Sequence, residues 1–125
     1  IIAEHHLGDC VILEGSKANP YPYMRYADLY VHPSYVESQG LTILEAMAFG
    51  IPCVVTKSRG PCEFIEDGIN GLLTEQTPES LTEKVLEILE DKELFRHIKE
   101  NTKCPEQFSP RQVVKQIETM IDGEN

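Results

Sequence analysis

Short runs of apolar residues recur along the chain, separated by polar and glycine-containing stretches. The central runs are β-branched and lack polar alternation, which is the pattern of strands that helices cover on both faces. Strands of this kind usually belong to a parallel sheet. We therefore predict four strands, at residues 11–13, 29–31, 53–55 and from residue 72 onwards.

The segments between and after these runs carry signals typical of helices. Residues 41–49 are rich in Leu, Ala and Met, and Gly50 and Pro52 should end this helix because glycine favours a left-handed cap and proline forbids continuation. Further helices or helical turns are predicted at residues 1–7 (the end of a helix, closed by Gly8), 22–27 (a short crossover), 62–66 and around Leu94, Phe95 and Ile98.

Two more helix starts are marked by capping residues. Thr77 precedes Pro78, and Ser109 precedes Pro110 with Gln112 in the position of a capping box. Apolar residues at helical spacing should face the sheet, and they are Leu81, Val85 and Leu89 in the first helix and Val113, Val114, Ile117, Met120 and Ile121 in the second.

This alternation of strands and helices predicts the class of fold. Short connections between apolar strands and helices favour a Rossmann-like, doubly wound α/β domain, with helices on both faces of a parallel sheet and the C-terminal helices packed on it. Ligands bind such sheets beyond the carboxyl ends of the strands. We therefore expect a functional site among the loops at residues 16–21, 34–40 and 57–61.

The composition limits the classes of protein to which the chain can belong. A chain of 125 residues with 41% hydrophobic residues fits one domain, and its net charge of −10 disfavours general binding to nucleic acid or anionic lipid. The longest apolar runs fall far short of the roughly 20 residues that a membrane-spanning helix needs, and no signal-peptide pattern opens the chain. We expect a cytoplasmic protein without membrane contact through this segment.

Cysteine and histidine give no sign of a metal site. The four cysteines contain no CxxC pair, and His5, His6, His32 and His97 lack the spacing of metal ligands, so we interpret these histidines as ordinary residues. An even number of cysteines permits disulfides, but reduced thiols are the ordinary state in a cytoplasmic α/β domain. No metal or cofactor is expected.

Residues 32–50 combine a strand end, a glycine-bearing loop and a helix start with two carboxylates, Glu37 and Glu45. Gly40 lets the backbone approach a ligand closely, and the first amides of the helix from Leu41 suit a phosphate. Glu45 lies on a largely apolar helix and needs partners. Two interpretations stand: it forms a capping box with Thr42, or it binds a ligand. Glu37 considered alone fits a solvated loop carboxylate.

The spacing of the two carboxylates resembles the E-x7-E signature of retaining glycosyltransferases of family 4, which have the GT-B fold. The order of other motifs agrees from about residue 9 to residue 89. These motifs are Ala27-Asp28-Leu29, Pro33-Ser34, Glu45-Ala46-Met47-Ala48 with Gly50 and Pro52, Gly60-Pro61-x-Glu63, and Gly68-x-Asn70-Gly71-Leu72-Leu73. Each motif is weak alone, and the combination is specific.

The resemblance implies that residues 1–125 are part of a C-terminal domain that binds a nucleotide diphosphate sugar. The start of this domain and an N-terminal domain, which binds a sugar or lipid-linked acceptor, would then lie outside the chain, so the 125 residues alone should not catalyse transfer. The donor is a substrate, and no cofactor is implied.

The same resemblance assigns roles to individual residues. Glu45 would bind the ribose hydroxyls, and Glu37 would hold hydroxyls of the transferred sugar. The sugar and diphosphate would meet the backbone at Ser38, Gln39, Gly40 and Leu41. Asn19 and Tyr21 would lie near the base, where Tyr21 or Tyr23 is either a cover for the base or a core aromatic residue.

The chain also departs from the family pattern. Glu37-Ser38-Gln39-Gly40 stands where E-G-F-G is commoner, and the usual basic pair for the diphosphate does not precede Asp9. Lys17, Arg25 and Arg59 are the cations near the inferred site, and an ordinary surface role is favoured for each. The alternatives are a sugar-nucleotide epimerase or hydrolase of related fold and a non-enzymatic receiver-type module. The second lacks the acidic cluster that it would need.

Overall fold

The computed structural model describes residues 1–109, and these form one parallel sheet with helices. The strands are β1 (Tyr30–His32), β2 (Cys53–Thr56) and β3 (Leu72–Thr74), in the order β1-β2-β3. The helices are α1 (Tyr21–Met24), α2 (Leu41–Ala48), α3 (Pro78–Glu90) and α4 (Lys92–Asn101), with the 3₁₀ turns η1 (Pro61–Glu63) and η2 (Glu106–Phe108). Three of the four predicted strands are confirmed, within one residue at their starts.

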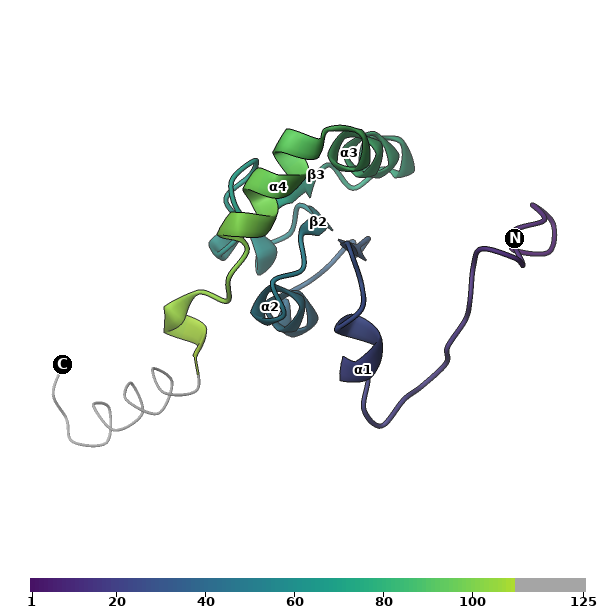
Figure 1. Cartoon of the computed structure of the whole chain (residues 1–125), viewed down its shortest axis with the longest axis horizontal. Helices are drawn as coiled ribbons and strands as arrows, with labels where there is room; N and C mark the ends of the chain where they lie inside the picture. The colour runs from purple at the N-terminus through teal and green to yellow at the C-terminus, as the bar shows by residue number, and fades with distance from the viewer. Residues whose placement is uncertain (110–125) are drawn as a thin grey trace, which may run out of the picture.

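Helices cover both faces of this sheet, as the doubly wound fold requires. All four residues of β2 are buried, and their side chains alternate between the faces. Cys53 and Val55 pack with the apolar residues of α2, while Val54 packs with Ile88 of α3 and Ile98 of α4. Figure 1 shows α2 on one side of the sheet and α3 with α4 on the other.

The predicted helix boundaries are largely confirmed. Gly50 follows α2 with a left-handed φ of 69°, and Thr77 caps α3 by accepting a hydrogen bond from the amide of Ser80. Asp91 ends α3 and also begins α4, where its Oδ1 accepts from the amides of Glu93 and Leu94.

One predicted core position of α3 is wrong. Leu81 and Val85 pack against the core, but Leu89 is 56% exposed and Ile88 is fully buried in its place. Ile88 follows Val85 by three residues and Leu81 by seven, so it shares their face of the helix. The prediction failed because it chose the wrong one of two adjacent apolar residues.

The predicted strand at residues 11–13 is wrong. Ile12 and Leu13 are 78% and 82% exposed, and the segment is assigned to no strand. Figure 1 shows the chain before α1 running away from the sheet. A strand is stabilised by hydrogen bonds to a neighbouring strand. Within residues 1–109, no strand pairs with residues 11–13.

The predicted helix end at residues 1–7 is wrong as well. This segment forms turns, through bonds such as His5 N to Ile1 O, and the left-handed residue is His6 rather than Gly8. A short helix without packing is marginal in water, which accounts for the difference. The helix predicted from Ser109-Pro110 lies outside the described residues.

The four cysteines are free thiols. Cys53 is fully buried in β2, and burial raises its pKa to about 12. Within residues 1–109, no helix has both the length and the apolar character to cross a bilayer.

Candidate functional site

The loop at residues 33–40 joins the carboxyl end of β1 to the start of α2. Its last residue, Gly40, caps α2 with a left-handed φ of 70°. A Cβ there would lie 3.0 Å from Cζ of Phe64 and 3.2 Å from Cδ1 of Ile43. Both the backbone conformation and the crowding therefore favour glycine at the point where the helix begins.

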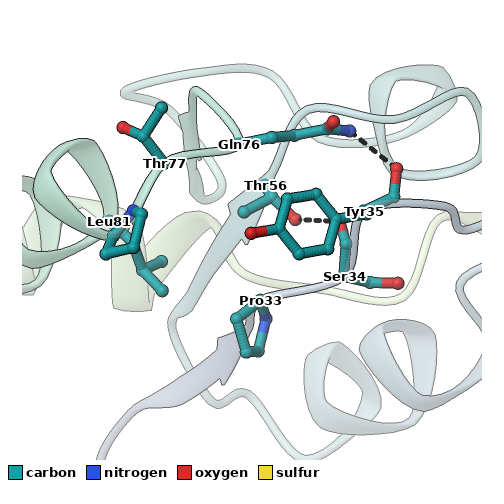
Figure 2. A pocket seen from close by; sticks show the side chains of 8 residues that line it. Pro33, Ser34, Tyr35, Thr56, Gln76, Thr77 and Leu81 are labelled. Carbon is teal, nitrogen blue, oxygen red and sulfur yellow. Dashed lines mark hydrogen bonds between the residues drawn. The ribbon is translucent and has the colours of Figure 1, made fainter.

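Side chains from the neighbouring strand ends hold this loop. The Thr56 hydroxyl donates to the carbonyls of His32 and Ser34. The Gln76 amide donates to the carbonyl of Tyr35 at 2.8 Å, and Figure 2 shows both Thr56 and Gln76 pointing toward the loop. The carboxyl edge of the sheet thus fixes the path of the chain into α2.

A second loop packs backbone to backbone against the first. The Gly60 amide donates to the carbonyl of Glu37 at 3.1 Å. A Cβ on Gly60 would lie 2.7 Å from the Ser38 carbonyl oxygen and 2.9 Å from the Gln39 nitrogen, distances at which one of the two loops must move. Gly60 is therefore required for this approach.

Glu37 turns back onto the loop that carries it. Its Oε1 accepts from the amides of Gln39 at 3.2 Å and Gly40 at 3.0 Å, and its Oε2 lies 3.3 Å from Nε2 of His32. The Gly40 amide, followed by that of Gln39, holds the pKa of Glu37 below its usual range. Glu37 is therefore an anion at neutral pH, and it already occupies two amides that the family resemblance assigned to the sugar and diphosphate.

The next amides of the helix remain available. Ile43 and Leu44 donate to the Gly40 carbonyl, each at 3.0 Å. The amides of Leu41 and Thr42 find no acceptor within residues 1–109, as expected for the first turn of a helix. They lie at the positive end of α2, where an anion is stabilised.

A polar network that sequence reasoning missed lies behind Glu37. Tyr30 donates its hydroxyl proton to Oγ1 of Thr42 at 3.0 Å, and the same hydroxyl lies 3.3 Å from Nδ1 of His32. The rings of Tyr30 and His32 stack, with their centroids 6.0 Å apart. Tyr30 and His32 alternate with Val31 on β1, so strand periodicity offered the signal that both face α2.

Glu45 is bound to the segment before β1. Its Oε1 accepts from the Tyr21 hydroxyl at 2.9 Å, and the Tyr21 ring lies 5.9 Å from that of Phe49. The hydrogen bond, followed by the charge of Glu45, raises the pKa of Tyr21. The Asn19 side chain accepts from the Tyr21 amide, so the structure brings Asn19, Tyr21 and Glu45 together.

The capping-box interpretation of Glu45 is wrong. The N-cap of α2 is Gly40, and no side chain caps it there. Glu45 instead finds its partner in Tyr21, which is 24 residues earlier in the chain. The carboxylate on this largely apolar helix is therefore paired across the fold.

The two carboxylates lie on the side of the sheet that α2 covers. The chain of contacts from Glu37 through His32 and Tyr30 ends at Thr42, one helical turn before Glu45. Burial raises the pKa of Tyr30, the hydrogen bond to Thr42 partly offsets this shift, and the nearby charges of Cys53, Glu45 and Glu37 raise the pKa further.

Two hollows flank these residues, and neither is lined by Glu37 or Glu45. The hollow at the carboxyl edge of the sheet has a volume of about 130 Å³ and lies among the residues of Figure 2. The other measures about 300 Å³ and includes Asn19, Tyr21 and Phe49. Glu37 follows the loop residues that line the first hollow, and Glu45 is bonded to Tyr21 of the second, so the two carboxylates share neither hollow.

The family of the chain follows from its similarity to known proteins. Residues 1–104 match the family described as "Glycosyl transferases group 1". The chain belongs to this family.

Individual members of the glycosyl transferase group 1 family and solved structures support the same placement. The chain is 33% identical over 123 residues to the N-acetyl-alpha-D-glucosaminyl L-malate synthase of Bacillus anthracis, matching 96% of the chain and 32% of that protein. HepE of Anabaena, solved in complex with UDP, has a TM-score of 0.89 and 28% identity, with 98% of this chain and 35% of that chain covered.

A third relative is the sucrose-phosphate synthase of Thermosynechococcus elongatus. Its structure gives a TM-score of 0.87 at 28% identity and covers 98% of this chain and 32% of that chain. The chain thus spans about a third of these relatives, with 32% of the first and 35% of HepE covered.

Of the three cations that the sequence places near the inferred site, two make exposed ion pairs and one lines a hollow. Lys17 pairs with Glu14 at 3.0 Å, and Arg59, which is 90% exposed, approaches Glu63 at 3.9 Å. Arg25 lines the larger hollow with Tyr21. Within the described part of the chain, no group of three or more metal-ligating side chains is placed to hold a metal ion.

Proposed function

We propose that this chain binds a nucleotide diphosphate sugar, and that the protein transfers the sugar to a hydroxyl acceptor with retention of anomeric configuration. The observation that carries the proposal is the membership of the glycosyl transferase group 1 family, taken together with the place of Glu37 and two unpaired helix amides at the carboxyl end of β1 and of Glu45 on the same helix, α2. Ligands bind such sheets at this edge.

The two carboxylates suit the hydroxyl groups of the donor. A carboxylate offers about four acceptor positions. Glu45 uses one of them for Tyr21, so it retains acceptors for the ribose hydroxyls. Glu37 uses three, for two amides and His32, and retains one for a hydroxyl of the transferred sugar. A charge-assisted hydrogen bond of this kind contributes about 1.5–3 kcal/mol.

The diphosphate would bind the amides of Leu41 and Thr42. Glu37 occupies the amides of Gln39 and Gly40, so of the amides that the resemblance suggested for the sugar and diphosphate the proposal keeps that of Leu41 and adds that of Thr42. Positive helix ends stabilise a departing diphosphate without reorganisation. Catalysis would rest on this stabilisation and on positioning of the donor, with Glu37 as a binding group.

The relatives support the nature of the donor. HepE of Anabaena was also solved with UDP and glucose, at a TM-score of 0.89 to this chain. Transfer to an acceptor agrees with the family better than epimerisation or hydrolysis. An assay of products separates these reactions, because an epimerase or hydrolase forms an altered sugar or free nucleotide without any acceptor.

The test is donor binding by the full-length protein. Saturation-transfer NMR with uridine, guanosine and adenosine diphosphate sugars should detect one of the three, with contacts to its ribose and sugar protons. Calorimetry of the Glu45→Ala variant should then show that this sugar nucleotide binds more weakly by about 1–3 kcal/mol, because the ribose loses its charged acceptor.

The matched control is Glu90→Ala, which removes an exposed carboxylate from α3. It should leave the affinity unchanged. Equal affinity of the Glu45→Ala and Glu90→Ala variants would contradict the ribose role of Glu45.

A further inference from the structure

We propose that His32 is a positioning residue that holds the Glu37 carboxylate in the orientation in which it meets the transferred sugar. This inference rests on the proposed function of Glu37. It starts from the contact between Nε2 of His32 and Oε2 of Glu37, 3.3 Å apart.

The two oxygens of Glu37 are held by different parts of the fold. Its Oε1 is fixed by the amides of its own loop, those of Gln39 and Gly40. The terminal torsion of a glutamate side chain is broad, so hydrogen bonds to one oxygen restrain the carboxylate less than hydrogen bonds to both. His32, from the end of β1, binds the second oxygen and adds this restraint.

His32 is itself held on both its backbone and its ring. Its carbonyl accepts from the Thr56 hydroxyl of β2. Its ring stacks on Tyr30, whose hydroxyl lies beside Nδ1 and donates to Thr42 in the first turn of α2. The orientation of the imidazole is thus set by β1, β2 and α2 together.

The chemistry of the pair defines one open acceptor position. An ionised carboxylate only accepts hydrogen bonds, so Nε2 of His32 carries the proton between them. The side chains of His32 and Glu37 are 17% and 25% exposed, which limits competition from water. The amides of Gln39 and Gly40 and Nε2 of His32 take up three acceptor positions of Glu37, so one position is left to accept a hydrogen bond from a sugar hydroxyl.

The experiment compares His32→Ala with His32→Gln in the full-length protein. Two affinities are measured by calorimetry, for the nucleoside diphosphate and for the corresponding nucleotide diphosphate sugar, together with kcat and KM for the donor. Val31→Ala is the control, because Val31 is the intervening residue of β1 and points away from this network.

We expect His32→Ala to lower kcat/KM by about tenfold to a hundredfold, mainly through kcat, because a small misplacement of a binding group is costly. The affinity for the nucleoside diphosphate should stay unchanged, since that part of the donor does not touch Glu37. His32→Gln should recover most of the loss, because its amide supplies a hydrogen-bond donor near the position of Nε2.

Several results would overturn the proposal. A His32→Ala variant within about twofold of the wild type would remove the role of His32. Equal losses for the nucleoside diphosphate and the sugar nucleotide would indicate general damage to the domain. A His32→Gln variant as poor as His32→Ala would show that the hydrogen bond is not what matters.

A fourth variant separates this inference from the function on which it rests. If Glu37→Gln lowers turnover and His32→Ala does not, His32 is not a positioning residue, while the donor site stands. If the wild-type protein binds no sugar nucleotide, the proposed function fails first and the role of His32 fails with it. Tyr30→Phe, which loses one hydroxyl from the network, should show a smaller loss of the same kind.

Discussion

The two faces of the sheet are built from the same three strands but differ in character. On the side of α3 and α4, the buried cluster consists of apolar residues, among them Val54, Ile88 and Ile98. On the side of α2, apolar packing gives way at β1 to Tyr30 and His32, which lead to Glu37 at the rim. The difference teaches that one face mainly supplies stability, while the other also orients the proposed binding groups.

The largest effect should come from the apolar face. Ile98→Ala should lower the free energy of unfolding by about 2–5 kcal/mol, because Ile98 is fully buried and its truncation leaves a cavity. Denaturant titration measures this loss. Leu89→Ala is the control, since that side chain is 56% exposed and should cost little. A folded Ile98→Ala protein that had lost its affinity for the donor would break the division between the faces.

A smaller effect should arise where the two rim loops meet. Gly60→Ala places a Cβ 2.7 Å from the Ser38 carbonyl oxygen, so we expect a loss of stability of about 1–3 kcal/mol, together with weaker donor binding as the loop of Glu37 shifts. Thermal unfolding and calorimetry measure the two effects. Gly8→Ala, which meets no atom within 4 Å, should change neither quantity. Unaltered donor binding by Gly60→Ala would mean that the loops are not coupled.

The smallest effect concerns the partner of Glu45. Tyr21→Phe removes one hydrogen bond, so donor affinity should fall by about 0.5–1.5 kcal/mol as Glu45 becomes less well oriented. Tyr23→Phe is the matched control on the same short helix. Tighter binding by Tyr21→Phe would instead mean that the tyrosine hydroxyl competes with the ribose for Glu45.

Local chemistry made much of the fold predictable. The apolar run at residues 53–55 was enough to predict a strand. Gly50 and Pro52 predicted the end of α2, and Thr77 with Pro78 predicted the start of α3. Each of these signals acts within a few residues of the feature that it specifies. The loops at the carboxyl edge followed in turn from the general behaviour of parallel sheets.

Features that depend on distant partners were not predictable in this way. Residues 11–13 have a strand pattern, but a strand also requires a neighbour. The spacing of Thr42 and Glu45 fits a capping box, yet Glu45 pairs with Tyr21 from another part of the chain. His32 showed no metal-ligand spacing, and its contact with Glu37 depends on the path of the intervening loop.

Asp91 has a mechanical consequence for the apolar face. One residue serves both as the last cap of α3 and as the first of α4, so no linker separates the two helices. The backbone of this single residue therefore sets the direction in which α4 leaves α3, and a substitution that removes the Asp91 side chain would expose the first amides of α4 at the point where the chain turns.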